Sequence, residues 1–305
     1  MQILIIGYSD IVRRRVIPSL LKVNDITSID LASKSTNFSK DFIENRFDDY
    51  NQAIKYSNAG LVYISLPNNL HYRFSKLALL HNKNVIVDKP AITRKNQLSP
   101  LIKLSAEKNL AISMSSVFNH HKCWNKFKKI SLKENDHGTL SLSFTIPKLN
   151  KDNIRMSKKL HGGAINDMAI YASNIGQLFW EKNLEKLSIY KQEKNNLVIG
   201  FNLIASYGNK KEMIGNFGFE KLYKNEVNYF GYNFNTKYER VFSPPPDFKT
   251  KIIKETNKKK NVIDVGKDDT FLNYFKYVLK NIKNDRHKLR EEFIMQNKEY
   301  LKYLN

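Results

Sequence analysis

Short apolar runs alternate with stretches of helical periodicity over the first 118 residues, and this alternation constrains the fold more than any other feature. One apolar run ends at Gly7, and segment 11–21 then carries apolar residues at the spacing of an amphipathic helix. Such alternation predicts parallel strands joined by right-handed helical crossovers, and hence an open doubly wound sheet. The remaining strand-like runs cover 26–32, 61–66, 84–88 and 110–115, with helical stretches at 71–81 and 98–109.

The pattern changes after residue 118. Strand-like runs now follow one another with little helix between them, apart from one helical stretch at 164–179 and a closing amphipathic stretch at 270–282. This arrangement favours an open, largely antiparallel sheet in an α+β domain. We therefore predict two domains, an α/β domain over 1–118 and an α+β domain over 119–305. The strand-like runs of the second part are 140–146, 184–190, 197–207, 212–219 and 227–232.

The net charge of +22 raises the possibility of nucleic-acid binding, because basic surfaces displace counterions from phosphate backbones. Lysines are spread along most of the chain, however, and no basic recognition helix or stacking motif accompanies them. The lysine-rich segment after the prolines at 244–246 is expected to be an exposed, solvated surface. Nucleic-acid binding is therefore the lowest-ranked of three hypotheses, and no nucleic-acid partner is predicted.

The single cysteine, Cys123, excludes an intramolecular disulfide and a multi-cysteine metal site. His120 and His121 lie close to it, but their spacing matches no closed metal site, so no metal is predicted. The start of the chain, 1–7, has no basic leader, and no later apolar run is long enough to span a bilayer. We therefore expect a cytoplasmic protein without a membrane partner.

The first strand-turn-helix is the place where such sheets hold the pyrophosphate of a dinucleotide. Its turn reads Gly7-Tyr8-Ser9-Asp10-Ile11-Val12, so only the first glycine of G-x-G-x-x-G is present. An ordinary strand-to-helix turn gives the same pattern, and Asp10 would repel a pyrophosphate unless its side chain points away. The candidate residues for binding a cofactor here are Gly7, Ser9, Asp10 and Ile11.

The end of the second strand discriminates between the two nicotinamide dinucleotides. An acidic residue there would bind the ribose hydroxyl of NAD and repel the 2′-phosphate of NADP. Here Ser33 stands at that place and Lys34 follows it, while Asp30 lies earlier, within the strand. A hydroxyl and a cation suit a phosphate, so NADP is favoured over NAD, although a plain polar turn would look the same.

Three blocks in order resemble the glucose-fructose oxidoreductase/inositol dehydrogenase (Gfo/Idh/MocA) family. Segment 63–72 (YISLPNNLHY) is similar to the family's T-P-N-x-x-H, and segment 84–90 (NVIVDKP) to its E-K-P. Residues 154–156 (IRM) and 161–171 (HGGAINDMAIY) resemble W-R followed by G-G-G-A-x-x-D-x-G-x-H. The resemblance implies a Rossmann domain and an α+β domain whose open sheet mediates dimer or tetramer contacts, with the substrate between nicotinamide and the second domain.

The resemblance also assigns roles to individual residues. Lys89 matches the family's active-site lysine, and Asp88 replaces the commoner Glu. Many members carry His at the position where Tyr171 stands. A subset that includes glucose-fructose oxidoreductase and dihydrodiol dehydrogenases resembles this chain in having Tyr there, and this Tyr gives or accepts the proton. Near the nicotinamide and its ribose, the resemblance places Ser65, Leu66, Pro67 and Asn68, and the predicted cofactor-binding set also includes His71, Asp88 and Lys89.

These residue types suit hydride transfer, which leaves charge on a carbonyl oxygen and so requires a proton donor. A phenol with a pKa of about 10 is a poor base at neutral pH, but a nearby ammonium stabilises the phenolate. We therefore assign proton transfer to Tyr171, assisted by Lys89. Asp167 lies four positions before Tyr171, on the same helix face, and would orient Lys89 or hold a substrate hydroxyl.

Three further residues have two open interpretations. Arg155 could bind an anionic substrate group or be an exposed loop arginine. Asn174 replaces a frequent Asp, so either a substrate contact or a charge partner could differ there. His71 could face the cofactor or serve as a capping or packing residue.

The hypothesis ranked first is an NADP(H)-dependent oxidoreductase acting on the carbonyl or hydroxyl carbon of a sugar or nucleotide-sugar, in a homodimer or homotetramer. The alternative is a non-catalytic dinucleotide-binding sensor or structural homologue, which the incomplete glycine turn would suit.

Overall fold

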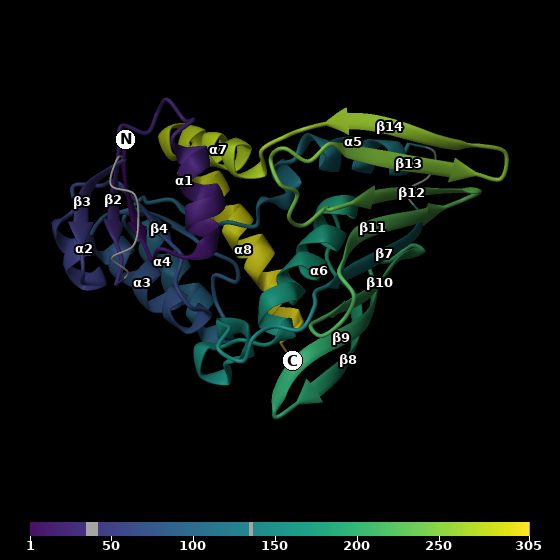
Figure 1. Ribbon diagram of the computed structural model, residues 1–305, viewed down its shortest axis with the longest axis horizontal. Helices are drawn as coiled ribbons and strands as arrows, with labels where there is room; N and C mark the ends of the chain where they lie inside the picture. The colour runs from purple at the N-terminus through teal and green to yellow at the C-terminus, as the bar shows by residue number, and fades with distance from the viewer. Residues whose placement is uncertain (35–41, 134–136, 305) are drawn as a thin grey trace. The chain divides into compact units, whose positions relative to one another are not determined.

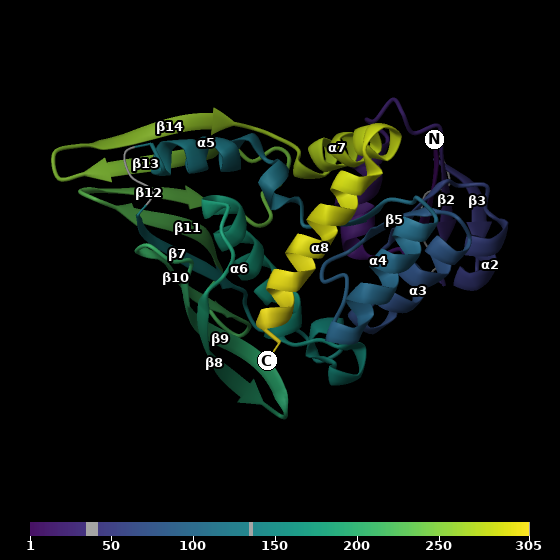
Figure 2. The same cartoon turned by 180° about the vertical axis from the view of Figure 1, so that it is seen from behind.

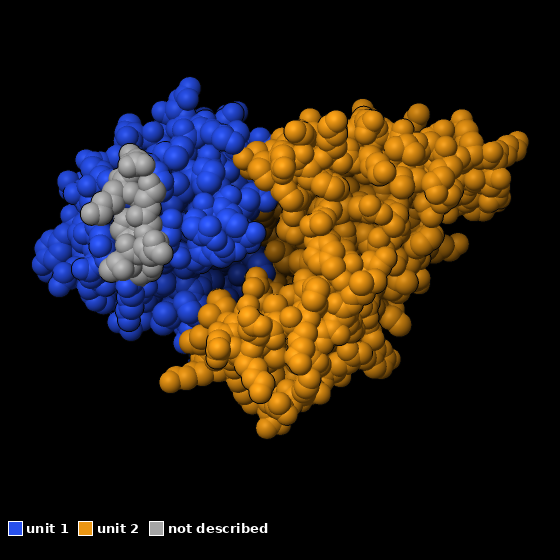
Figure 3. Space-filling view, in the orientation of Figure 1, with its two compact units in different colours: residues 1–115, 271–297 blue, residues 116–270, 298–305 orange. Residues whose placement is uncertain are grey.

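The computed structural model describes residues 1–34, 42–133 and 137–304. The chain forms two compact units, coloured separately in Figure 3. The first unit consists of Met1–Ser115 and Phe271–Asn297, and the second of Ser116–Thr270 and Lys298–Asn305.

The first unit is built on a six-stranded sheet in the order β3-β2-β1-β4-β5-β6, with every neighbouring pair parallel. The chain order reverses between β1 and β4, which is the topological switch point of a doubly wound sheet. The predicted fold class is therefore confirmed for this part of the chain. The strands are β1 Gln2–Ile6, β2 Ser28–Ala32, β3 Ile43–Phe47, β4 Leu61–Ile64, β5 Asn84–Val87 and β6 Ile112–Met114.

Strands β1, β4 and β5 are buried almost throughout, because helices cover both faces of a parallel sheet. This burial explains why the three strands read as continuous apolar runs. The sequence analysis missed β3, whose residues IENRF are mostly polar and exposed at the edge of the sheet. The helices of this unit, drawn in Figures 1 and 2, are η1 Val12–Val16 and α1 Ile17–Leu20, α2 Tyr50–Tyr56, α3 Asn68–Leu80, η2 Lys95–Gln97, α4 Leu98–Glu107, α7 Thr270–Asn284 and most of α8 Arg286–Lys302.

Helix α7 belongs to the first unit although it follows the second in the chain. Its Phe275 is fully buried and meets the ring of Tyr63 on β4 edge-on, with centroids 5.9 Å apart. The Tyr274 hydroxyl lies 2.7 Å from Ser113 Oγ on β6. The predicted domain boundary, which assigned 119–305 to one domain, differs from the structure here. Periodicity shows that a helix has an apolar face but not which sheet that face covers.

The second unit is built on an eight-stranded sheet in the order β14-β13-β12-β11-β7-β10-β9-β8. Among the described strands of this sheet, only β7 and β10 pair in parallel, so the predicted open, largely antiparallel sheet is confirmed. The strands are β7 Gly138–Thr145, β8 Lys186–Lys194, β9 Leu197–Ser206, β10 Lys211–Gly218, β11 Lys224–Gly231, β12 Phe234–Glu239, β13 Thr250–Thr256 and β14 Lys260–Gly266.

Helices pack on one face of this sheet. Helix α6 contacts β7, β9 and β10, and α5 contacts β12 and β13. The lysine-rich segment, expected to be exposed, forms the β13–β14 hairpin, and most residues of β14 are exposed. Among the described residues, no helix has both the length and the hydropathy required to cross a bilayer. The helices are η3 Val117–His120, α5 Lys122–Ser131, η4 Ile154–Met156, η5 Lys158–Leu160, α6 Ala164–Trp180 and the end of α8.

The packing of α7 on the first sheet can be tested with Phe275→Ala. We expect the free energy of unfolding, measured by urea denaturation, to fall by about 3–5 kcal/mol, because the change leaves a cavity against Tyr63. The control is Leu80→Ala on the same unit, where an exposed side chain should change stability by about 0.5 kcal/mol or less. Equal effects of the two substitutions would contradict the packing of Phe275.

Candidate active site

The turn after β1 is held against the end of β4 by a glycine. Gly7 adopts φ +92°, a conformation that strains other residues, and a Cβ built on it would lie 2.1 Å from the carbonyl oxygen of Ser65. The Gly7 N–H also donates to the carbonyl of Ala32 on β2, at 2.9 Å. The first fingerprint glycine is therefore required sterically, and it brings the turn close to the carboxyl ends of β2 and β4.

A network of hydroxyl groups converges on Asp88, the residue after β5. Ser65 Oγ donates to one carboxylate oxygen at 2.5 Å, while Tyr63 and Ser115 donate to the other at 2.5 and 2.8 Å. Burial and the neighbouring carboxylate raise the pKa of Tyr63 well above its usual value, so this phenol remains a hydrogen-bond donor. Asp88 is thus held by three hydroxyl donors from the ends of β4 and β6, and its backbone leads directly into Lys89.

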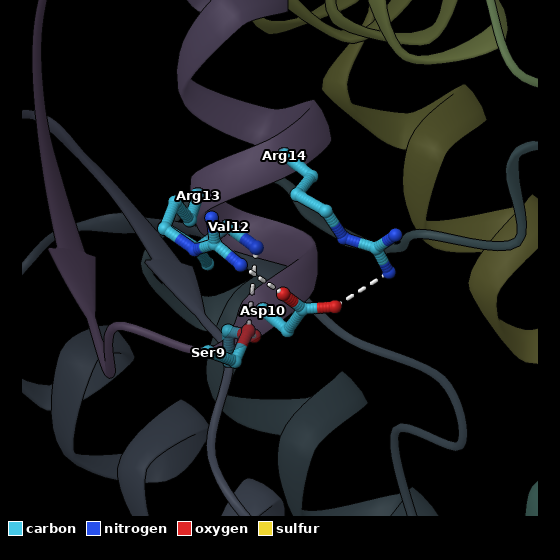
Figure 4. A network of polar contacts seen from close by, with 6 residues as sticks. Ser9, Asp10, Val12, Arg13 and Arg14 are labelled. Carbon is cyan, nitrogen blue, oxygen red and sulfur yellow. Dashed lines mark hydrogen bonds and ion pairs between the residues drawn. The ribbon is translucent and has the colours of Figure 1, made fainter.

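Asp10 is ion-paired on the exposed side of the first helix. Its two carboxylate oxygens lie 2.6 Å from an Arg13 Nη2 and 2.5 Å from an Arg14 Nη2 (Figure 4). Exposed pairs of this kind stabilise a protein by little. They do offset the negative charge of Asp10 at the helix start, and so weaken the repulsion that this charge would exert on a pyrophosphate.

The end of β2 carries no available acid. Asp30 is fully buried, and its carboxylate accepts hydrogen bonds from the side chains of Ser57 at 2.6 Å, Asn45 at 2.9 Å and Gln2 at 3.0 Å. Ser33 is buried and its N–H donates to Phe47, whereas Lys34 is exposed. Of the two residues predicted to bind a phosphate, Lys34 is therefore accessible to solvent and Ser33 is not.

Segment 65–71 runs from the end of β4 into the first turn of helix α3. Leu66, Pro67 and Asn68 are partly exposed, as residues that border a ligand must be. His71 is buried, and its ring nitrogens lie 2.8 Å from the Pro90 carbonyl oxygen and 2.7 Å from that of Leu66. Burial lowers its pKa. His71 therefore ties the two motif segments together, which favours the packing interpretation.

In the second unit, Arg155 and Asp167 form an ion pair. Arg155 Nε donates to Asp167 Oδ2 at 2.9 Å, and this carboxylate raises the pKa of the arginine. The local chain fold brings them together, because the Gly163 N–H donates to the Arg155 carbonyl at 2.7 Å and Gly163 leads into α6. A Cβ on Gly162 would lie 2.4 Å from that same carbonyl oxygen, so the glycine pair is a steric requirement.

Tyr171 on α6 lies in a cluster of aromatic rings. Its ring centroid is 4.9 Å from that of Phe242, 5.4 Å from Phe144 and 6.4 Å from Phe118. The side chain is partly exposed, so three rings fix its orientation without enclosing it. Sequence reasoning missed these three phenylalanines, because nothing in their local patterns distinguishes them from other core residues.

Asn174 lies one turn further along α6 and is fully buried. Its amide donates to Ser116 Oγ at 3.2 Å within the second unit. This burial argues against the substrate contact predicted for Asn174 and gives it an internal role. Ile11, the last residue predicted at the first turn, is partly exposed.

The three motif blocks at 63–72, 84–90 and 154–171 thus correspond to the end of β4, the end of β5 and the loop that leads into helix α6. A sequence model of an oxidoreductase family with an NAD-binding Rossmann fold, GFO_IDH_MocA, matches residues 1–116. Over these residues the chain is similar to the Gfo/Idh/MocA family. The resemblance inferred from the first two blocks, which lie within these residues, is thereby confirmed, and with it the class of the protein as an oxidoreductase.

Curated relatives and solved structures extend the likeness beyond the matched residues. Two relatives are dTDP-3,4-didehydro-2,6-dideoxy-α-D-glucose 3-reductases. The protein from Streptomyces antibioticus is 24% identical over 88% of this chain and 84% of the relative, and that from Actinomadura kijaniata 28% identical over 80% and 76%. A crystal structure of a 3-ketoreductase from Actinomadura kijaniata with NADP and TDP-benzene has a TM-score of 0.91 at 22% identity, covering 97% of this chain and 94% of that one.

An aldose-aldose oxidoreductase from Caulobacter crescentus has the same fold, with a TM-score of 0.84 at 12% identity over 98% of this chain and 94% of the other. The Actinomadura ketoreductase has also been crystallised as variants in which a tyrosine is replaced by phenylalanine, or a lysine by alanine or glutamate.

The steric role of Gly7 can be tested with Gly7→Ala. We expect the free energy of unfolding to fall by about 1–3 kcal/mol, because the new methyl group meets the Ser65 carbonyl and the φ angle becomes strained. Gly60→Ala is the matched control, since a Cβ at Gly60 meets nothing within 4 Å. The assignment fails if thermal or urea denaturation shows Gly7→Ala to be as stable as the control.

Proposed function

We propose that this protein is an NADP(H)-dependent reductase that converts a keto group of a nucleotide-linked sugar to a hydroxyl. The observation that carries the proposal is the agreement between four curated relatives, all 3-reductases of one dTDP-linked keto sugar, each aligned over most of this chain. The solved ketoreductase bound to NADP and TDP-benzene supports the same substrate class.

The first unit fits a nicotinamide dinucleotide. The turn at Gly7 has the close backbone approach that a pyrophosphate site requires, and the charge of Asp10 is offset by two arginines. Asp30, the acid within β2, is buried and occupied, so it would not repel a 2′-phosphate near Lys34. These features support NADP, with Gly7, Ser9 and Ile11 along the pyrophosphate and Ser65 to Asn68 beside the nicotinamide ribose.

When bound, NADPH supplies the hydride that adds to the carbonyl carbon, and the chain supplies the proton. In our proposal the Tyr171 hydroxyl donates its proton to the carbonyl oxygen as negative charge develops there. In the same proposal the ammonium of Lys89, which follows the anchored Asp88, stabilises the resulting phenolate. The aromatic rings around Tyr171 orient the phenol for this transfer.

Asp167 and Arg155 take a different role from the one expected from sequence. Because the carboxylate of Asp167 accepts from Arg155 Nε, we propose that it orients this guanidinium. The arginine side chain is 43% exposed, so its terminal nitrogens are accessible to an anionic part of a substrate, such as a diphosphate.

The proposed activity is tested by following NADPH oxidation with dTDP-linked 3-keto sugars, against free keto sugars as controls. Turnover of the nucleotide-linked compounds alone is the expected result, because only these carry the diphosphate that Arg155 would bind. Absence of NADPH oxidation with every compound, together with absence of NADPH binding, would overturn the proposal.

The catalytic pair is tested by Tyr171→Phe and Lys89→Ala. Tyr171→Phe keeps the packed ring and removes only the proton donor, so we expect kcat to fall by about 100- to 10,000-fold. Tyr190→Phe, at an exposed tyrosine of β8, is the control and should retain full activity. If Tyr171→Phe keeps more than half of the wild-type kcat, another group donates the proton.

We also propose a homo-oligomer formed through the face of the second sheet that α5 and α6 leave uncovered. Ile204 on β9 pairs with Ile214 on β10, and these side chains are 56% and 43% exposed, while their neighbours Leu203 and Met213 are buried on the opposite face. An exposed apolar strip of this kind favours association. A cytoplasmic location remains part of the same proposal.

The oligomer is tested by Ile204→Lys and sedimentation velocity. A charge in the strip should lower the sedimenting mass to that of the monomer, because burying an unpaired ammonium is costly. Leu222→Lys, an exposed residue between β10 and β11, is the control and should leave the mass unchanged. An unchanged mass for Ile204→Lys would place the interface elsewhere.

A further inference from the structure

Two of the three glycines of the dinucleotide fingerprint are absent from this chain, because Ser9 and Val12 stand at their positions. The Ser9 hydroxyl is hydrogen-bonded within the protein. Its Oγ lies 2.7 Å from Ser65 Oγ. The same oxygen accepts a hydrogen bond from the Val12 N–H at 3.3 Å, which Figure 4 shows as a dashed line. The turn is thus fixed by contacts that a glycine at position 9 cannot make.

The donors and acceptors in these contacts allow one direction only. A carboxylate accepts and cannot donate, so the Ser65 hydroxyl donates to Asp88 Oδ2. Ser65 then has no hydrogen left for Ser9, so the Ser9 hydroxyl donates to Ser65 Oγ. The Ser9 oxygen in turn accepts from the Val12 N–H. We refer to Val12 N–H, Ser9, Ser65 and Asp88, in this order, as the hydroxyl relay.

The hydroxyl relay crosses the carboxyl ends of three neighbouring strands. Ser9 follows β1, Ser65 follows β4 and Asp88 follows β5, and these strands are adjacent in the sheet. Asp88 cannot easily turn away from Ser65, because Tyr63 and Ser115 hold its other oxygen. The relay therefore ends on an anchored carboxylate and transmits that rigidity to the turn.

We propose that Ser9 and Ser65 are positioning residues, which hold the turn after Gly7 in its cofactor-binding shape through Asp88 and so replace the two absent glycines. This inference rests on the proposed dinucleotide-binding function. A turn ordered before the cofactor arrives loses less conformational freedom on binding, which raises affinity without any new contact. The relay also joins the turn to the residue that precedes Lys89.

The glycine fingerprint and the hydroxyl relay predict opposite effects of a glycine at position 9 on NADPH binding. Ser9→Gly restores the second glycine of G-x-G-x-x-G, yet it removes the link between the turn and Ser65. We expect Ser9→Gly and Ser65→Ala each to raise the Kd and KM for NADPH by about tenfold, the effect of one hydrogen bond. We expect kcat at saturating NADPH to fall by a smaller factor, because the proton donor is unchanged.

Two arms separate positioning from general loss of structure. Ser9→Thr keeps the hydroxyl and should bind NADPH within about twofold of wild type. Ser113→Ala removes a buried serine of the same sheet whose hydroxyl contacts Tyr274 instead of Asp88, and its Kd for NADPH should equal that of wild type. The double variant of Ser9→Gly with Ser65→Ala should be no weaker than either single variant, because one break interrupts the whole relay.

The outcomes are distinguishable by fluorescence titration with NADPH. Wild type that binds NADPH, with Ser9→Gly binding as tightly or more tightly, overturns the relay and leaves the proposed function standing. Additive losses in the double variant also overturn it, because they show two independent contacts. Wild type that binds neither NADPH nor NADH overturns the proposed function and the relay together.

Discussion

The close approach of Gly7 to the Ser65 carbonyl is the constraint on which the first unit's candidate site depends. It holds the turn after β1 against the end of β4, at the position where the strand order reverses. Such a reversal leaves the carboxyl ends of neighbouring strands uncovered by crossover connections, which is why ligands bind there. Ser65, Asp88 and Lys89 all follow strand ends at this edge.

Polar groups at this edge are satisfied by one another. Asp88 would be costly to bury alone, but three hydroxyl donors surround it, and Tyr63 is kept protonated by the same environment. Asp30 shows the same logic deeper in β2, where amide and hydroxyl donors occupy its carboxylate. One carboxylate therefore organises the candidate site, while the other stabilises the fold and stays away from any ligand.

In the second unit, a short stretch of chain carries the remaining candidate site residues. Two glycines allow the Arg155 carbonyl to approach the start of α6, and this places Arg155 beside Asp167. One turn later Tyr171 packs against three phenylalanines that come from separate parts of the chain. The proposed proton donor is thus placed by packing, and the proposed anion-binding group by a hydrogen-bonded loop.

The sequence by itself determined the class of each sheet, the first turn and the family resemblance, because strand and helix periodicity and three motif blocks are local properties of the chain. It did not determine β3, whose polar residues carry no strand signal, or the assignment of α7 to the first unit, because an amphipathic face does not specify its partner. It also left open whether His71, Asn174 and Asp167 face a ligand. The tertiary structure buries His71 and Asn174 within their units and pairs Asp167 with Arg155, through contacts between residues that the sequence alone does not bring together.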